Sequence, residues 1–368
     1  MKKVLVTPLD WGLGHATRCV PIINELLKRN CTVVIGGCGE SLELLKKEFP
    51  ALTFLSLPAY RPIYPSSGSM FWKMLTQLPR FLSTIKQEHA AIEQIIKDSK
   101  IDLIISDNRF GCWSDAVPSV FITHQTNILL PKMVTWLSPI VQSLNHVLIR
   151  RFSACWIPDY PDGRSLAGKL RSLKGKKQVV SIKYIGVLSR FGPPKPREIL
   201  YDIVCILSGP EPQRRAFEKI ATDELSRSGL RYFVVRGIVS PNNEMEVNPH
   251  CINFLNGSDL QVIIEQSEYV LARSGYSTVM DMATLGKKAI FVPTPGQTEQ
   301  EYLAARLKAK GIAFFVTQKD FNIMEAWSSS HSFTGFNQFP SDVHFLTDAL
   351  DEFVPVAVAM EMPQQIRI

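Results

Sequence analysis

The stretch DWGLGHATR, residues 10–18, brings together residue types that bind anions. Gly12 and Gly14 lie two positions apart, and His15 and Arg18 follow within one helical turn. Glycines let backbone N–H groups approach a ligand without interference from a Cβ atom, and the N-terminus of a following helix attracts negative charge. We therefore expect this turn to contact an anion or a polarisable oxygen.

A second group of such residues lies in ARSGYSTVMDMATLGKKAIFVPTPGQTEQEYLAARL, residues 272–307. Arg-Ser-Gly at 273–275 follows an apolar run, and the helix that begins there offers free amides to an anion. Asp281 lies within that helix, where an acidic side chain can accept hydrogen bonds from ribose hydroxyls. Gln300 and Glu301 open a later helix and offer an amide and a carboxylate to sugar hydroxyls. A nucleotide sugar would satisfy all of these groups at once.

Both stretches follow apolar runs that predict buried β-strands. In the first half, runs at 4–7, 32–36, 52–57, 103–106 and 119–123 alternate with helical spacings at 16–29, 40–48 and 71–98. The second half has runs at 201–209, 231–235, 251–255, 268–275, 287–295 and 311–317, with a helix from about residue 212. This alternation predicts parallel sheets covered by helices.

The stretch GVLSRFGPPKPREI, residues 186–199, interrupts both patterns with three prolines and predicts a linker. We expect two Rossmann-like, doubly wound α/β domains, 1–192 and 198–340, that are joined by 193–197 and face a cleft. Residues 341–368 form a tail or helix that could cross back to the first domain.

The composition predicts a globular protein without a membrane span. Hydrophobic residues make up 45% of the 368 positions and charged residues 20%, and no apolar segment has the length or flanks of a signal peptide or a spanning helix. The seven cysteines are scattered, without the spacing of metal ligands. We expect reduced thiols in a cytoplasmic protein and no metal site.

The net charge of +7 is unevenly distributed. Residues 1–192 carry 25 lysines and arginines against 13 acidic residues. Because these basic residues are dispersed rather than clustered with aromatics, we expect no nucleic-acid partner but an anionic membrane surface or a phosphorylated lipid. The segments 69–81 and 127–152 suit interfacial helices, although amphipathic core helices would explain them equally well. Peripheral contact with the inner face of the cytoplasmic membrane is therefore an open alternative.

The segment 272–307 resembles the donor-binding signature of glycosyltransferase family 28, the MurG-like GT-B glycosyltransferases. GLGHATR at 12–18 resembles the glycine-rich turn of that family, and PSVFITHQTN at 118–127 resembles its strand that ends in a histidine motif. The resemblance covers roughly residues 3–317. The matching residues of the second half are Arg273, Ser274, Gly275, Thr278, Val279, Asp281, Gly286, residues 291–293, Gln300 and Glu301.

The resemblance implies a GT-B fold with the acceptor domain first and the UDP-sugar donor domain second. It also implies inverting transfer without a cofactor or an essential metal, and the sequence has no D-x-D motif. The implied acceptor-binding residues are Gly12, Gly14, Arg18, Asn108, His124, Gln125 and Asn127. The implied donor-binding residues are Ser208, Gly209, Arg214, Arg273, Ser274, Gly275, Thr278, Asp281, Gln300 and Glu301.

The second glycine-rich loop departs from the family pattern. It reads SGPEPQRR, and Pro210 and Pro212 remove two N–H donors from the expected phosphate cradle. We therefore expect Arg214 to supply the charge that backbone amides supply elsewhere.

An inverting transfer needs a base for the acceptor hydroxyl and positive groups for the leaving diphosphate. His15 is the first candidate for the base because an imidazole titrates near neutrality. Asp107, at the end of a strand, is the alternative, and Arg18 would meet a phosphate or an acceptor carboxylate. His15 could instead cap its helix, and His124 could be a buried core residue.

These residues predict a glycosyltransferase that moves a hexose or N-acetylhexosamine from a UDP-sugar to a hydroxyl of a lipid-linked or envelope glycan. Two alternatives remain open. GLGHATR also resembles the G-x-G-H-x-x-R turn of nucleotide-sugar hydrolases, in which His15 would activate water. The third alternative is a nucleotide-sugar-binding protein without catalytic activity.

Overall fold

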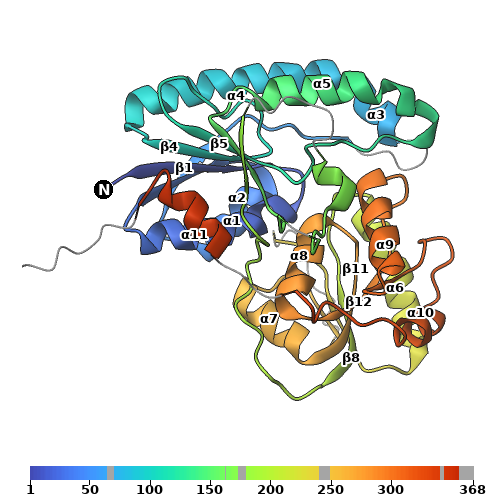
Figure 1. Cartoon of the computed structure of the whole chain (residues 1–368). Coiled ribbons are helices and arrows are strands. Elements are labelled where there is room, and N and C mark those ends of the chain that lie inside the picture. The colour runs from blue at the N-terminus through green and yellow to red at the C-terminus, as the bar shows by residue number, and fades with distance from the viewer. Residues whose placement is uncertain (64–69, 162, 173–179, 240–248, 340–343, 356–368) are drawn as a thin grey trace, which may run out of the picture.

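The computed structural model describes residues 1–63, 70–161, 163–172, 180–239, 249–339 and 344–355, which form two α/β domains (Figure 1). The first domain has a parallel sheet with the strand order β3-β2-β1-β4-β5-β6-β7. Its strands are β1 (Lys3–Pro8), β2 (Thr32–Gly37), β3 (Thr53–Ser56), β4 (Leu103–Asp107), β5 (Ser119–Ile122), β6 (Ala154–Ile157) and β7 (Ser181–Tyr184). Its helices are α1 (Leu13–Lys28), α2 (Gly39–Glu48), α3 (Met70–Thr76), α4 (Leu78–Ser99) and α5 (Ser138–Ile149), with 3₁₀ turns η1 (Lys132–Leu137) and η2 (Gly168–Arg171).

The second domain repeats this architecture with the strand order β10-β9-β8-β11-β12-β13. Its strands are β8 (Tyr201–Ile206), β9 (Tyr232–Val235), β10 (Cys251–Ile252), β11 (Ser267–Ala272), β12 (Lys288–Phe291) and β13 (Phe314–Phe315), and all of them pair in parallel. Its helices are α6 (Gln213–Ser228), α7 (Gly257–Glu265), α8 (Tyr276–Leu285), α9 (Thr298–Ala309) and α10 (Ile323–Ser330). The prediction of two parallel-sheet α/β domains is confirmed.

Two local predictions were incomplete. The helix expected over 71–98 is two helices, α3 and α4, that meet at Gln77. Pro79 lies in the first turn of α4, where its missing N–H costs nothing, but it could not continue α3. The strands β6 and β7 were not predicted: the run of β6 is only ACWI, and β7 reads SIKY, which is exposed or half-buried and has no continuous apolar run.

The two domains pack closely through α1 and α8. Figure 1 shows α1 and α2 between the first sheet and the second domain, whereas α4 and α5 cover the opposite, outer side of that sheet. Buried residues from both domains, among them Ile22 in α1 and Val279 in α8, form one continuous hydrophobic core. The site between the domains therefore rests on a shared core.

The chain returns to the first domain through α11 (His344–Asp351). Arg29, which directly follows α1, donates to the Asp351 carboxylate (2.5 Å) and to the Val354 carbonyl (2.7 Å). The ring of Phe353 packs edge-on against Trp156 of β6. Residues 341–343 and 356–368, which belong to the predicted tail, lie outside the described residues.

Candidate functional site

The predicted acceptor-side residues lie at the carboxyl edge of the first sheet. Strands β1 and β4 are neighbours, and Pro8 is in register with Asp107. Because both strands end at this edge, the first turns of α1, which carry His15 and Arg18, meet the end of β4. This placement joins His15 and Arg18 to Asp107, which is 89 residues from Arg18 in the sequence.

Arg18 and Asp107 form a buried ion pair directly behind His15. The Arg18 Nε donates to one carboxylate oxygen of Asp107 (2.5 Å), and Arg18 Nη2 donates to the other. The Nδ1 atom of His15 lies 3.3 Å from Asp107 Oδ1 and 2.9 Å from Arg18 Nη2. Arg18 and Asp107 are buried, whereas the His15 side chain is 16% exposed. Of the three side chains, the imidazole is thus the one that is partly exposed to solvent.

Burial and neighbouring charges give Asp107 and His15 different protonation states at neutral pH. Burial opposes ionisation of Asp107, but the charge of Arg18, together with His15, lowers the pKa of Asp107 to about 2. Burial and the nearby charge of Arg18 lower the pKa of His15, and the Asp107 carboxylate partly opposes them. At neutral pH the site therefore contains an ionised carboxylate and an uncharged imidazole.

His124 and Gln125, which follow β5 in the first domain, contact Glu299 of the second domain, in the first turn of α9. The His124 Nε2 lies 2.8 Å from Glu299 Oε1, and the Gln125 amide donates to the other carboxylate oxygen. The Nδ1 of His124 lies 3.2 Å from Arg18 Nη1. The His124 ring also stacks on Tyr276 of α8, with 4.2 Å between ring centroids. His124 is therefore buried and also joined to the predicted site.

The remaining acceptor-side residues support this cluster. With its amide oriented to match its neighbours, Asn108 accepts from Arg18 Nη2 (2.9 Å) and donates to Thr123. Asn127 donates to the Lys169 carbonyl (2.8 Å). Gly12 has a φ of 87°, which favours glycine, and a Cβ at Gly14 would lie 2.8 Å from Ser277 Oγ of α8. Of these residues, Gly14 is the one that lies directly against the second domain, where its carbonyl accepts from Ser277 Oγ.

The predicted donor-side residues form a second cluster at the start of α8 and α9. Ser274 donates to the Gln300 carbonyl (2.9 Å), and the Gln300 side chain accepts from the Thr294 N–H (2.8 Å). Glu301 accepts from the Gly296 N–H (2.9 Å). Gly275 is the N-cap of α8 and has no capping side chain, and Thr278 in the first turn is partly exposed. The loops that precede α8 and α9 are thus held by hydrogen bonds next to the N-terminus of α8, which has no capping side chain.

The two predicted donor-side arginines are engaged within the protein. Arg273 is buried and donates to the carbonyls of Val292 (2.9 Å) and Pro293 (3.1 Å). Arg214, beyond the Ser208–Gly209 turn, pairs with the carboxylates of Glu211 and Glu218. Their roles in binding the donor remain predictions, because carboxylates already balance the charge of Arg214 and carbonyls already accept from Arg273.

Asp281 lies beneath the linker. Its carboxylate accepts from Ser189 Oγ (2.6 Å), and burial raises its pKa to about 6, against the opposing charge of Arg190. Its side chain is buried. Asp281 is thus near the junction of the domains, and its predicted contact with ribose stays a prediction.

Glu299 is the residue that sequence reasoning missed. It directly precedes Gln300 and Glu301, which were chosen as candidates for sugar recognition. Its partners His124 and Gln125 are 175 and 174 residues away, so no local spacing signals the contact. The available signal was an acidic residue in a helix first turn, which is more often only a favourable helix-dipole interaction.

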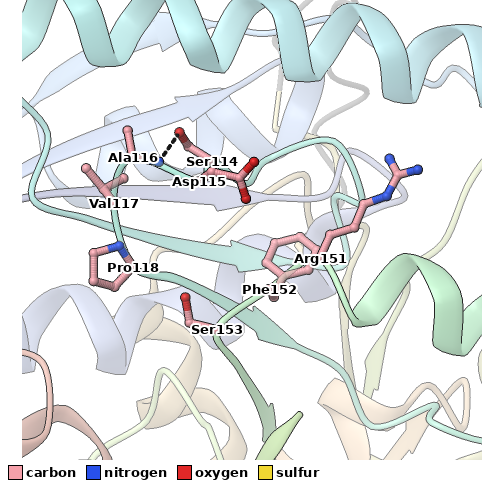
Figure 2. Close-up of a pocket in the computed structure, with 8 residues that line it drawn as sticks. All are labelled: Ser114, Asp115, Ala116, Val117, Pro118, Arg151, Phe152 and Ser153. Atoms are coloured by element: carbon pink, nitrogen blue, oxygen red, sulfur yellow. Dashed lines mark hydrogen bonds between the residues drawn. The ribbon is translucent and has the colours of Figure 1, made fainter. Parts of the chain in front are cut away.

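A shallow pocket lies at the opposite edge of the first sheet (Figure 2). It is lined by Ser114, Asp115, Ala116, Val117, Pro118, Arg151, Phe152 and Ser153, which precede β5 and β6. None of these residues belongs to the two clusters. Within the described ranges, no group of three or more His, Cys, Asp or Glu side chains is arranged to hold a metal ion.

Comparisons with known proteins agree with the resemblance seen in the sequence. Residues 217–326 match the model of the glycosyltransferase family 28 C-terminal domain. An uncharacterized glycosyltransferase of Methanosarcina acetivorans is 24% identical over 333 residues, which are 84% of each chain. A UDP-N-acetylglucosamine–N-acetylmuramyl-(pentapeptide) pyrophosphoryl-undecaprenol N-acetylglucosamine transferase of Wigglesworthia glossinidia brevipalpis is 20% identical over 362 residues, 90% of each chain.

The fold is also similar to that of solved glycosyltransferases. MurG of Acinetobacter baumannii superposes with a TM-score of 0.54 at 13% identity, and the match covers 96% of this chain and 99% of that one. The predicted GT-B fold, with two parallel-sheet domains facing each other, is confirmed.

Proposed function

We propose that the chain is a GT-B glycosyltransferase of the family 28 type, which transfers a sugar with inversion from a UDP-sugar to an acceptor hydroxyl. The proposed sugar is a hexose or N-acetylhexosamine. The proposed acceptor is a lipid-linked or envelope glycan, in keeping with the name of the Wigglesworthia relative. The observation that carries the proposal is the pairing of His15 with a buried, ionised Asp107 opposite the donor-side helices.

The geometry favours His15 over Asp107 as the base. The lowered pKa of Asp107 and its two hydrogen bonds from Arg18 make it a weak proton acceptor. His15 is partly exposed, and its lowered pKa keeps the imidazole uncharged at neutral pH. When Nδ1 donates to Asp107, the Nε2 lone pair is free to accept a proton. Asp107 then orients the base.

The reaction needs one bond formed and one broken at the anomeric carbon. The acceptor oxygen attacks that carbon while His15 takes the hydroxyl proton, and the bond to the diphosphate breaks with both electrons on the leaving UDP. The open N-terminus of α8 at Gly275 offers amides and a positive helix end to the diphosphate charge. Gln300 and Glu301, in the first turn of α9, would bind the donor sugar.

UDP release by the purified chain tests this proposal. A panel of UDP-sugars is assayed with and without a membrane-lipid extract from the source organism. Release that depends on the extract supports a transferase and allows the acceptor to be fractionated. Equal release without extract would instead indicate a hydrolase with His15 activating water. UDP-sugar binding without any release would indicate a binding protein.

Contact with an anionic membrane at the cytoplasmic face is a further part of the proposal. Among the described helices, none has the length and apolar character to cross a bilayer. However, the helices on the outer side of the first sheet, which Figure 1 shows as ribbons, carry large apolar residues whose side chains are exposed. They are Trp72, Leu75, Leu78, Leu82, Met133, Trp136, Ile140, Leu144 and Val147. Exposed Lys73, Arg80 and Lys132 lie among them, which suits an anionic surface.

Vesicle sedimentation tests the membrane contact separately from catalysis. The parent should sediment with vesicles that contain about 30% phosphatidylglycerol, because an anionic surface attracts basic residues. It should sediment less with vesicles of pure phosphatidylcholine. Replacing Met133 and Trp136, which are 86% and 72% exposed, with serine should reduce the bound fraction. Met324→Ser, at an exposed position on α10, is the control. Equal sedimentation of all three proteins would remove the membrane contact and leave the transferase proposal intact.

A further inference from the structure

Glu299 links the second domain to the hydrogen-bond network around His15, the proposed base. Its carboxylate binds His124 and Gln125, both from the first domain. The Glu299 side chain is 28% exposed, and the neighbouring His124 lowers its pKa although burial opposes this. Glu299 is therefore ionised at neutral pH and acts only as an acceptor.

The two neighbours of His124 specify one tautomer of its ring. Arg18 is always a donor, so its Nη1, 3.2 Å away, requires a lone pair on His124 Nδ1. The proton of the neutral ring must then be on Nε2, which lies 2.8 Å from the acceptor Glu299 Oε1. Glu299 and Arg18 thus hold His124 from opposite sides.

The same guanidinium connects His124 to the proposed base. Arg18 uses Nη1 for His124 and uses Nε and Nη2 for Asp107, and Nη2 also lies 2.9 Å from His15 Nδ1. The two N–H groups of Nη2 reach Asp107 and Asn108, so the Nδ1 of His15 donates to Asp107 unless Arg18 moves and offers it one of these N–H groups. A small movement of Arg18 therefore decides which nitrogen of His15 carries the proton.

We infer that Glu299 is a positioning residue, through which the donor domain fixes His124, Arg18 and finally the orientation of His15. This inference rests on the proposed function, because it assigns a purpose to the network only if His15 is the base. Glu299 acts through His124, not on the substrate. Partners that orient a metal-bound imidazole are commonly worth about 10-fold or more in activity, and we expect an effect of similar size for the orientation of His124.

Histidine ¹⁵N NMR on the full chain without substrate tests the inference directly. The parent should show His124 protonated at Nε2. In Glu299→Ala the His124 signals should move toward a mixture of tautomers, and the His15 signals should shift with them. Tyr302→Phe is the matched control, because Tyr302 lies on the same helix and accepts from the Lys169 N–H across the domains (2.7 Å) without touching the ring network. His15 signals that are the same in Glu299→Ala and the parent would overturn the inference.

Kinetics separate this inference from the proposed function. Glu299→Ala should lower kcat about 10-fold or more with less than about a threefold change in KM for the UDP-sugar. Glu299→Gln should recover most of kcat, because its amide oxygen can still accept from His124. If His15→Gln retains turnover, the proposed base is wrong. If His15→Gln is inactive while Glu299→Ala matches the parent, only the role of Glu299 is wrong.

Discussion

The predicted acceptor-side and donor-side residues are held in place by different kinds of contact. On the acceptor side, His15, Arg18, Asp107 and His124 satisfy one another through side-chain contacts between distant parts of the chain. On the donor side, Ser274, Gln300 and Glu301 are held by backbone groups within 26 residues or fewer. The first arrangement sets proton positions, whereas the second sets loop shape.

This difference suggests a division of labour. A network of charged side chains responds as a unit when one member is removed. A loop braced by its own backbone keeps its shape when one side chain changes, and loses only the contact which that side chain would make. We therefore expect acceptor-side substitutions to affect turnover and stability strongly, and donor-side substitutions to affect UDP binding more locally.

The largest effect is expected for His15→Gln. Loss of a general base typically lowers turnover by about 10²–10⁴-fold, and the affinity for UDP should stay near that of the parent. UDP release and titration calorimetry measure the two quantities. In the parent, the acid limb of the kcat profile should lie below the ordinary histidine range, because burial and Arg18 lower the pKa of His15. A variant with near-parental turnover would show that the acceptor-side network is structural.

Asp107→Asn should have the largest effect on stability. It leaves Arg18 buried with an unbalanced charge, which typically costs about 3–5 kcal/mol. Urea denaturation measures the change. Glu43→Gln, which removes an exposed ion pair with Lys46, should cost less than about 1 kcal/mol. Equal losses in the two variants would contradict the importance of the buried pair.

The same pair predicts how stability depends on pH. The folded-state pKa of Asp107 is about 2, below its ordinary value of 3.8. Its stabilising contribution is therefore present above pH 4 and is lost as the pH falls toward 2. The parent should lose stability over this window more steeply than Asp107→Asn. Parallel curves for the two proteins would show that Asp107 does not gain stability from ionisation.

The contrast between the two sides also explains what could be predicted from the sequence. Alternating apolar runs predicted both sheets except for β6 and β7, and the local spacing of Arg273, Asp281 and Gln300 predicted a donor-binding segment, which stays a prediction. His15 and Asp107 were proposed as rival bases, because nothing in the sequence shows that they touch. Likewise, the pairing of Glu299 with His124 exists only after both sheets and the domain junction have formed.

The variant Asp281→Asn tests whether a substitution on the predicted donor side has only a local effect. Its folded-state pKa of about 6 is above the ordinary 3.8, so folding favours its protonated form. Its contribution is present below pH 4 and is lost as the pH rises through 6, when a buried carboxylate must ionise. Asp281→Asn should therefore be more stable than the parent at pH 8, by about 2–3 kcal/mol from the size of the shift, and equal to it near pH 4.

The affinity of Asp281→Asn for UDP should fall, whereas the stability of this variant at pH 8 should rise. If the carboxylate accepts from ribose hydroxyls, the variant should bind UDP less tightly in calorimetry although it is more stable. Unchanged affinity together with the stability gain would remove the ribose assignment. Turnover at saturating donor should stay close to the parent, in contrast to His15→Gln.

The smallest effect is expected where the two sides touch, at Gly14. A Cβ there would lie 2.8 Å from Ser277 Oγ, which donates to the Gly14 carbonyl (2.9 Å). Because a serine hydroxyl can rotate away, Gly14→Ala should cost about 1 kcal/mol. Gly163→Ala, where a Cβ meets no atom within 4 Å, should cost less.

Adding Ser277→Ala removes the crowding oxygen, so the double variant should lose less stability than the sum of the single variants. Strict additivity would mean that the turn and α8 are not coupled, and that the acceptor-side network is held without the donor domain.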